Sequence, residues 1–269
     1  MVISNLIIVF VSVVNMMLST LTINMITWIG YDTQSEMMTK ITNGIFVAQF
    51  FNTGLIYLFV YANFGETIPG LGGIFRGPYY DYTTEWYTTV GGGLLIYTML
   101  FNSLFPQIMQ CVADFQKWLF RRMDQSWAKG LDATYSTKCT QVSQYVKLYS
   151  GDDYIVHFRY SGLLTTAYVT MLYGVGMPVL FPIALFTYAM YWIHEKYHMA
   201  YTYQLPPSYD DRLTENMIQM LRWSPIMLLL NGYWMLDNQQ IFNGYFYTKD
   251  TSTSLMLTGH TFNSLASVS

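Results

Sequence analysis

Residues 160–196 read YSGLLTTAYVTMLYGVGMPVLFPIALFTYAMYWIHEK, and this stretch decides the fold. It carries no charged side chain before its last two residues, and Gly174, Gly176 and Pro178 interrupt it near the middle. It is too long for one bilayer crossing, which takes about 20 residues as a helix, and glycine and proline weaken or break helices. We therefore predict a hairpin of two short membrane helices, residues 160–179 and 180–196.

The composition extends this prediction to most of the chain. Hydrophobic residues make up 52% and charged residues only 11% of the sequence, whereas an ordinary soluble domain carries about 25% charge. Long uncharged segments recur from the start of the chain onward. The fold class predicted is all-α, a polytopic transmembrane helical bundle of about six spans and an integral, multi-pass membrane protein. The spans expected are residues 2–28, 41–63, 86–111, 160–179, 180–196 and 216–236.

The charge balance and the cysteines exclude several classes of function. The net charge is −3 and basic residues are few, which argues against a nucleic-acid partner. Cys111 and Cys139 form neither a metal-type spacing nor a disulfide framework. We expect no cofactor, and the lipid bilayer is the first partner that the sequence implies.

Amide side chains lie inside two of the predicted spans. Gln49 and Asn52 fall in the second span, and Asn102 and Gln107 fall in the third. Lipid offers an amide no partner, so such a side chain must bond another helix or water. Two interpretations stay open, namely hydrogen bonds between helices and a wetted pathway lined by these four residues.

The third span also contains three consecutive glycines, Gly91, Gly92 and Gly93. Each glycine weakens a helix by up to about 1 kcal/mol relative to alanine. The triplet serves either close helix packing or a hinge that flexes during gating, and Pro106 adds an expected kink.

A basic amphipathic segment follows this span. In the connector 112–157, apolar residues including Trp118 recur every three or four positions opposite Arg121 and Arg122, which is typical of a helix that faces an anionic membrane surface. Residues 237–269 are expected to form a polar, loop-like tail. Between Phe115 and Arg159 the sequence has seven basic residues, which the positive-inside rule places in the cytosol, with both termini outside. They are Lys117, Arg121, Arg122, Lys129, Lys138, Lys147 and Arg159.

Several short motifs resemble the membrane helices of the OSCA-type, calcium-permeable stress-gated cation channels, relatives of the anoctamins and the transmembrane channel-like proteins. The resemblance covers about residues 1–236 as helix order, and its sharp motifs, which include the bend in residues 171–178, lie in Arg159–Asp211. The others are Phe158-Arg159-Tyr160, Pro182, Tyr191-Trp192, Lys196-Tyr197, residues 201–210, Ser224-Pro225, Thr39-Lys40 and Glu85-Trp86-Tyr87.

The resemblance implies a groove between helices that passes cations, or lipid headgroups in some relatives, and opens under membrane tension. It implies that Gly91–Gly93 form the gating hinge and that the protein is a homodimer or part of a larger membrane assembly. Family members carry further helices and a cytosolic domain upstream. The chain is therefore expected to be either the C-terminal membrane portion of a larger protein or a reduced relative.

A competing interpretation rests on His194-Glu195-Lys196-Tyr197-His198, which matches the zinc-protease pattern H-E-x-x-H. Two imidazoles one helical turn apart could hold zinc, with Glu195 as the base. A third ligand would come from Asp237, which the expected topology places on the other membrane face, roughly 30 Å away. Glu215 and Asp210 lack supporting spacing. The same residues are also expected where a membrane helix reaches the surface, because long polar side chains there extend towards the water. We therefore expect no catalytic residue and no enzyme.

The function predicted from sequence is the membrane domain of a mechanically or osmotically gated, non-selective cation channel with lipid-scramblase kinship. The expected pore-lining residues are Gln49, Asn52, Asn102 and Gln107. The main alternative is a structural subunit of a larger membrane complex that transports nothing itself, and the zinc metalloprotease is the lesser alternative.

Overall fold

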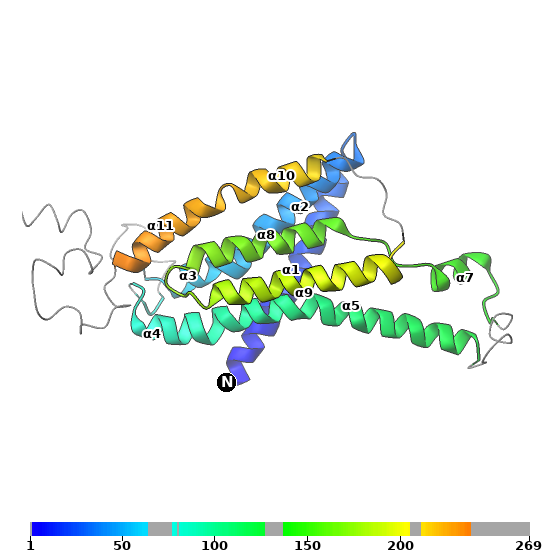
Figure 1. Cartoon of the computed structure of the whole chain (residues 1–269), viewed down its shortest axis with the longest axis horizontal. Coiled ribbons are helices and arrows are strands. Elements are labelled where there is room, and N and C mark those ends of the chain that lie inside the picture. The colour runs from blue at the N-terminus through cyan, green and yellow to red at the C-terminus, as the bar shows by residue number, and fades with distance from the viewer. Residues whose placement is uncertain (1, 64–76, 80, 127–136, 205–210, 238–269) are drawn as a thin grey trace, which may run out of the picture. The chain divides into compact units, whose positions relative to one another are not determined.

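The computed structural model describes residues 2–63, 77–79, 81–126, 137–204 and 211–237, with side chains from Val13 onward, and within these ranges it contains helices and no β-strand (Figure 1). The all-α prediction is thus confirmed for the part described. Most of the predicted tail, residues 238–269, lies outside it. The elements are α1 (Val2–Ile29), α2 (Gln34–Phe50), η1 (Phe51–Leu55), α3 (Ile56–Tyr61), α4 (Thr84–Trp86), η2 (Tyr87–Leu95), α5 (Ile96–Asp124), α7 (Val142–Tyr149), α8 (Val156–Tyr173), α9 (Leu180–Tyr201), α10 (Arg212–Leu221) and α11 (Ser224–Asp237).

Two helical stretches of the described chain are long and apolar enough to cross a membrane, Gln34–Tyr61 and Thr84–Asp124. They contain most of the second predicted span and all of the third; the first stretch begins earlier than predicted and ends at Tyr61, and the second extends beyond both predicted ends. The first starts before residue 41 because the Thr33 hydroxyl accepts a hydrogen bond from the Glu36 backbone N–H and so caps α2. In the second, the helix continues past residue 111 to Asp124 without a break.

The other four predicted spans do not meet this standard within the described residues. In α1, side chains are described only from Val13, and the part Val13–Ile29 is apolar. The last span, 216–236, is two helices, because α10 ends at Leu221 and α11 starts at Ser224. With 14 residues, α11 is about 21 Å long at 1.5 Å per residue, against roughly 30 Å of hydrocarbon core. The arrangement of six spans is therefore not confirmed.

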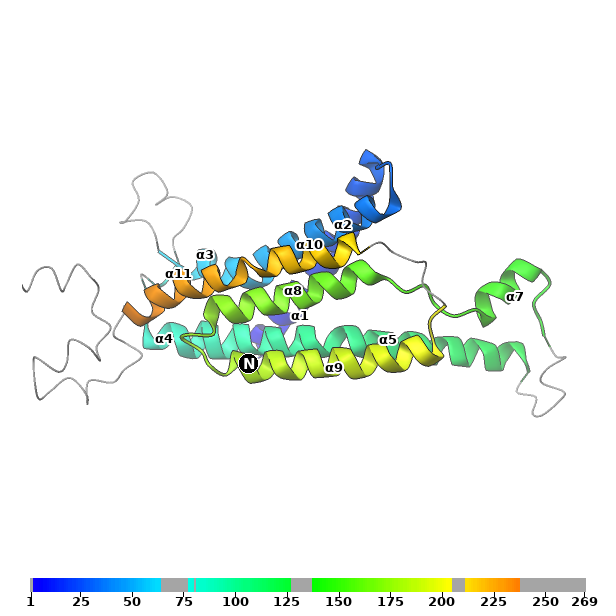
Figure 2. The same ribbon diagram turned by 45° about the horizontal axis from the view of Figure 1, so that its top comes forward.

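The chain divides into two compact units, the first made of residues 1–100, 157–186 and 209–269 and the second of 101–156 and 187–208. In the first unit the chain reverses direction between α8 and the first turns of α9 (Figure 2). The reversal uses Gly174 to Val179, as the sequence predicts. The fully buried Tyr173, the last residue of α8, donates its hydroxyl to the Gly54 carbonyl of η1 at 2.8 Å.

The core of the first unit is aromatic. The ring of Tyr168 on α8 meets Phe46 of α2 edge-on at 4.8 Å between centroids, and Tyr82 meets Trp86 at 4.7 Å. Buried aromatic rings favour such edge-to-face contacts because the positive ring edge faces the negative ring face. The first contact packs α8 against α2, and the second packs the segment before α4 against α4 itself.

Polar side chains tie the last two helices to this core. The Tyr168 hydroxyl donates to the Met220 carbonyl of α10. On α11, the buried Asn231 donates to the Leu172 carbonyl at 2.6 Å and accepts from the Tyr82 hydroxyl at 2.7 Å. One amide therefore joins α11 to both α8 and the segment before α4.

In the second unit, α7 is tied to the end of α5 by charge-assisted hydrogen bonds. The Arg121 guanidinium donates to three carbonyls at the C-terminus of α7, those of Leu148 at 3.0 Å and of Tyr149 and Ser150 at 3.3 Å. Cations stabilise helix C-termini, where carbonyls lack helical partners. The Asp124 carboxylate accepts from the Tyr149 hydroxyl at 2.9 Å, so α7 has a second anchor on α5.

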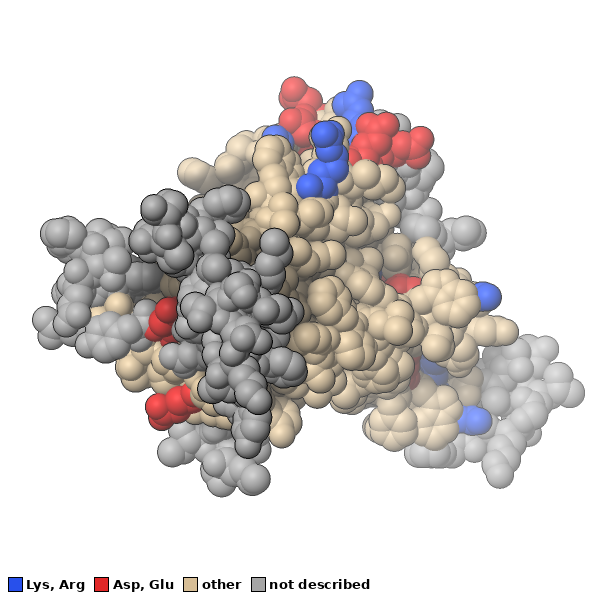
Figure 3. All heavy atoms as spheres, turned by 60° about the vertical axis from the view of Figure 1, so that its left-hand side comes forward, with Lys and Arg blue, Asp and Glu red and all other residues tan. Residues whose placement is uncertain are grey.

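Apolar side chains cover much of the surface. Figure 3 shows uncharged residues over most of the described part of the face drawn, with charged residues gathered in a few places. Exposed fractions reach 89% for Trp28, 71% for Leu185 and 68% for Leu229. Extensive exposed apolar surface marks a membrane or a protein partner.

The double role of Asn231 makes a stability prediction. In an Asn231→Leu variant the Tyr82 hydroxyl and the Leu172 carbonyl lose a buried partner, and each loss costs about 1–3 kcal/mol. We expect the variant in detergent to unfold at a clearly lower temperature than wild type by near-UV circular dichroism. Tyr233→Leu, at an exposed position of the same helix, is the control and should change little. Equal unfolding temperatures for Asn231→Leu and wild type would contradict the structural role.

Candidate functional site

The structure brings the predicted hinge and the predicted bend together. A groove of about 360 Å³, which we call the hinge groove, lies between the start of the Thr84–Asp124 helix and the loop after α8. The helix contributes Thr84, Tyr87, Gly92 and Ile96, and the loop contributes Gly176, Met177, Pro178 and Val179. Gly92, Gly176 and Pro178 were predicted as hinge or bend residues, whereas Tyr87 and Met177 appeared only within sequence motifs, because their place in the groove depends on how two distant segments pack.

The glycine triplet lies in a π-helical stretch, η2, whose turns are wider than those of an α-helix. Such stretches are rare in proteins and occur frequently at functional sites. The second long helix, Gln34–Tyr61, has its own π-helical stretch, η1, around Gly54. Each of the two candidate membrane helices therefore departs from α geometry at a glycine.

The three glycines have different surroundings. A Cβ atom at Gly91 would overlap the Met177 sulfur, so Gly91 serves close packing. At Gly92 and Gly93 a Cβ would meet only carbonyl oxygens of the same helix, at 3.4 and 3.5 Å. Packing therefore explains why residue 91 is a glycine, whereas no close contact requires glycine at positions 92 and 93.

The bend glycines are packed tightly too. A Cβ at Gly174 would lie 2.5 Å from the Thr170 carbonyl oxygen and 2.7 Å from the Phe181 ring. At Gly176 it would lie 2.8 Å from the Tyr87 hydroxyl oxygen. That hydroxyl is buried and has no hydrogen-bond partner among the described residues. The bend and the glycine helix are thus in direct contact through Tyr87.

Gln49 and Asn52, two of the predicted pathway residues, take part in hydrogen bonds between helices. The Asn52 side chain donates to the side-chain oxygen Oδ1 of Asn15 in α1 at 2.9 Å, and the Asn15 side chain donates to the Thr53 hydroxyl at 3.0 Å. Gln49 donates to Ser19 at 3.3 Å and accepts from Thr165 of α8 at 3.4 Å. These bonds join α1, the Gln34–Tyr61 helix and α8.

The other two predicted pathway residues lie on α5, in the second unit. The Asn102 side chain is half-buried, and Pro106 one turn later has no N–H to offer the Asn102 carbonyl. Gln107 is 4% exposed, and neither its amide nitrogen nor its oxygen has a partner within the described chain. The buried Ser103 hydroxyl, one turn before Gln107, likewise has no hydrogen-bond partner within the described chain. An unpaired buried amide costs free energy unless water or a ligand binds it.

Trp118, Arg121 and Arg122, predicted to face lipid, lie on the last turns of α5. Trp118 is 47% exposed, and the Arg122 guanidinium lies over its ring at 5.9 Å. Arg121 differs from its neighbour, because its guanidinium binds the end of α7.

His194 and His198 lie one turn apart on α9, with ring centroids 4.0 Å apart and ring planes tilted by 38°. The buried His198 ring places Nδ1 3.3 Å from the Asp114 carboxylate of α5. No group of three His, Cys, Asp or Glu side chains in the described ranges is arranged to hold a metal ion. His198 therefore contacts α5 through the Asp114 carboxylate.

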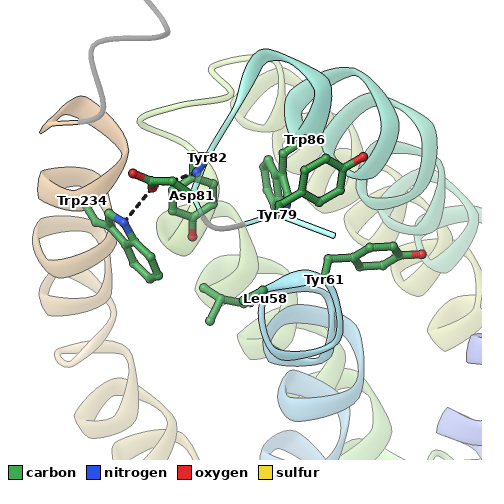
Figure 4. A pocket seen from close by; sticks show the side chains of 8 residues that line it. Leu58, Tyr61, Tyr79, Asp81, Tyr82, Trp86 and Trp234 are labelled. Atoms are coloured by element: carbon green, nitrogen blue, oxygen red, sulfur yellow. Dashed lines mark hydrogen bonds between the residues drawn. The ribbon is translucent and has the colours of Figure 1, made fainter. Parts of the chain in front are cut away.

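A smaller cavity, of about 20 Å³, lies among aromatic side chains including Tyr61, Trp86 and Trp234 (Figure 4). Asp81 lines it and accepts hydrogen bonds from the Tyr82 backbone N–H at 2.8 Å and from Trp234 Nε1 at 2.9 Å. Small-molecule sites measure about 300–1,000 Å³, whereas this space suffices for about one water molecule. Asp81 thus ties α11 to the segment before α4.

Comparisons with known proteins give no relative from which to infer function. No family model matches the chain, and neither a curated protein nor a solved structure matches it. The function is therefore inferred from the residues of this chain.

The different surroundings of Gly91 and Gly92 give a matched pair of variants. Gly91→Ala overlaps the Met177 side chain, and overpacking costs typically about 1–3 kcal/mol. Gly92→Ala adds a methyl that would make only an ordinary van der Waals contact with the Tyr87 carbonyl oxygen, so it should leave stability unchanged or raise it by up to about 1 kcal/mol. Unfolding temperatures in detergent measure both effects. Equal losses for the two variants would contradict the assignment of Gly91 alone to packing.

His157 lies at the start of α8, before the span predicted from residue 160. It is 8% exposed, neither ring nitrogen has a hydrogen-bond partner among the described residues, and burial lowers its pKa to about 4. Unfolding returns the pKa to about 6.5, so the unfolded chain binds more protons between pH 4 and 6.5 and stability falls as the pH falls through this window.

We expect His157 to remove about 1–2 kcal/mol of stability between pH 7 and pH 5. A His157→Gln variant should not show this contribution to the fall in stability between pH 7 and pH 5, whatever its stability at pH 7. Unfolding temperatures of both proteins across this range test the difference in slope. Parallel pH profiles would show that His157 does not titrate as described.

Proposed function

We propose that the chain is the membrane-embedded helical part of a mechanically or osmotically gated, non-selective cation channel. The observation that carries the proposal is the π-helical glycine stretch η2 packed against the bend after α8. The two long apolar helices, the exposed apolar surface and the OSCA-like motifs support it. In this proposal all six predicted segments lie in the bilayer, the shorter helices as partial spans.

In this proposal the π-helical stretch η2 is the part that moves. A π turn holds one more residue than an α turn, so conversion of η2 to α geometry would rotate the following helix by about 100°. Gly92 and Gly93 present no side chain to this change, and Gly91 rests on Met177 of the bend. Tension that widens the protein in the membrane would pull this contact apart and favour the conversion.

The polar groups that follow on the same helix would meet the ions. Ser103 and Gln107 provide oxygen atoms of the kind that bind cations. Gln107 and Ser103 have no protein partner in the described part, so they can bond water or ions without breaking existing bonds. Gln49 and Asn52 would need to exchange the hydrogen bonds they make to α1 and α8.

The paired amides favour a second candidate, a structural subunit that transports nothing. In that case Gln49, Asn52 and Asn15 serve only to join helices. Such a subunit should purify in fixed ratio with other proteins, whereas a channel protomer should purify alone or as a homo-oligomer.

Patch recording of the full chain in liposomes under suction tests the channel proposal. We expect tension-activated, weakly selective cation currents from protein that elutes as one species with a helical circular dichroism spectrum. In a Gly92→Ala/Gly93→Ala variant, alanine should favour α geometry by up to about 2 kcal/mol in total, so the channel should open at lower tension. Exposed Leu229→Ala on α11 is the control and should gate like wild type.

The two parts of the proposal fail separately. Absence of tension-activated current from well-folded wild-type protein would rule out channel activity of this chain alone. If the double alanine variant gave currents whose tension threshold was unchanged or raised, channel activity would be supported but the role of Gly92 and Gly93 as a hinge would be ruled out.

A further inference from the structure

The second unit contains a groove of about 590 Å³ between α5 and α7, which we call the basic groove. Its walls are firmly held, because Arg121 binds three carbonyls at the end of α7 and Asp124 binds Tyr149. The groove is therefore a feature of the packed unit.

Its polar lining suits an anion. Lys117 and Gln116 project from α5, and Lys147 and Gln144 project from α7. Lys117 forms an ion pair with Asp152, which also lines the groove. An ammonium group has three N–H donors, so Lys117 keeps donors for a second acceptor, and Lys147 is exposed. Two ammonium groups against one carboxylate leave a net positive charge.

The apolar lining distinguishes the expected ligand from a free ion. Phe120 lines the groove and is 54% exposed, and Leu148 lies on the facing helix. On α7 itself Val142 is 80% exposed. A headgroup that carries acyl chains covers such residues, whereas phosphate or another small anion would leave them in water. Basic residues close to aromatic and aliphatic ones are typical of surfaces that bind anionic lipid.

We propose that the basic groove binds the headgroup of an anionic phospholipid, with Lys117 and Lys147 on the phosphate and Phe120 against the acyl chains. This site lies outside the hinge groove and does not depend on conduction by the chain. It requires only that the end of α5 meets the membrane surface.

Lipid binding to the full chain in detergent, measured by native mass spectrometry, tests the site. We expect phosphatidylserine to bind about tenfold more tightly than phosphatidylcholine at low salt, and to lose most of this preference at 0.5 M salt because charge attraction is screened. Lys147→Gln preserves the pair between Lys117 and Asp152 and should weaken phosphatidylserine binding by about fivefold. Lys117→Gln/Lys147→Gln should abolish the preference.

Matched controls separate a built site from diffuse charge. Lys40→Gln/Lys196→Gln removes the same charge from positions outside the groove and should bind phosphatidylserine like wild type. Equal losses in both double variants would overturn the proposal. So would equal affinity for water-soluble glycerophosphoserine or inorganic phosphate, which would indicate an anion site without a lipid. Unfolding temperatures confirm that each variant is folded, and loss of current without loss of lipid binding would affect the channel proposal alone.

Discussion

The hydrogen bond from the Tyr173 hydroxyl to the Gly54 carbonyl is the contact around which the first unit is organised. Tyr173 is the last residue of α8 and has no exposed surface. Its bond fixes the start of the bend against η1, and its ring lies 6.0 Å from Trp86, the residue that precedes η2. A buried hydroxyl and a buried carbonyl each need a partner, so this one pair determines where the bend meets both long helices.

The same requirement recurs across the apolar helices. Asn231 joins α11 to α8, and Asn15 joins α1 to the Gln34–Tyr61 helix. In surroundings that offer little water, these bonds supply position as well as stability, because a displaced amide has no alternative partner. Gln107 and Ser103 are among the buried polar side chains of the described chain that have no protein partner, so water, an ion or a ligand could bind them without displacing a protein group.

The two proposed sites use different physics. The hinge groove depends on glycine, which allows close contact at Gly91 and wide π turns at Gly92 and Gly93. The basic groove depends on positive charge between two helices. The Arg121 guanidinium binds carbonyls at the end of α7 and so holds that helix in place, and Lys117 and Lys147 are the cations that line the groove. Sequence reasoning treated Arg121 and Arg122 alike, and only the fold separates a capping cation from one that lies over Trp118.

The sequence by itself determined the helical class, the bend at Gly174–Pro178 and the two longest apolar helices, because uncharged runs and glycine or proline breaks act locally. It also identified the glycine triplet and the polar residues Gln49, Asn52, Asn102 and Gln107 as unusual. Only the tertiary structure decided that Gly91 packs on Met177, that Gln49 and Asn52 bond other helices while Gln107 has no partner in the described part, and that His198 faces Asp114. These outcomes depend on which residues far apart in the chain become neighbours. The spacing of apolar residues along one helix does not contain that information.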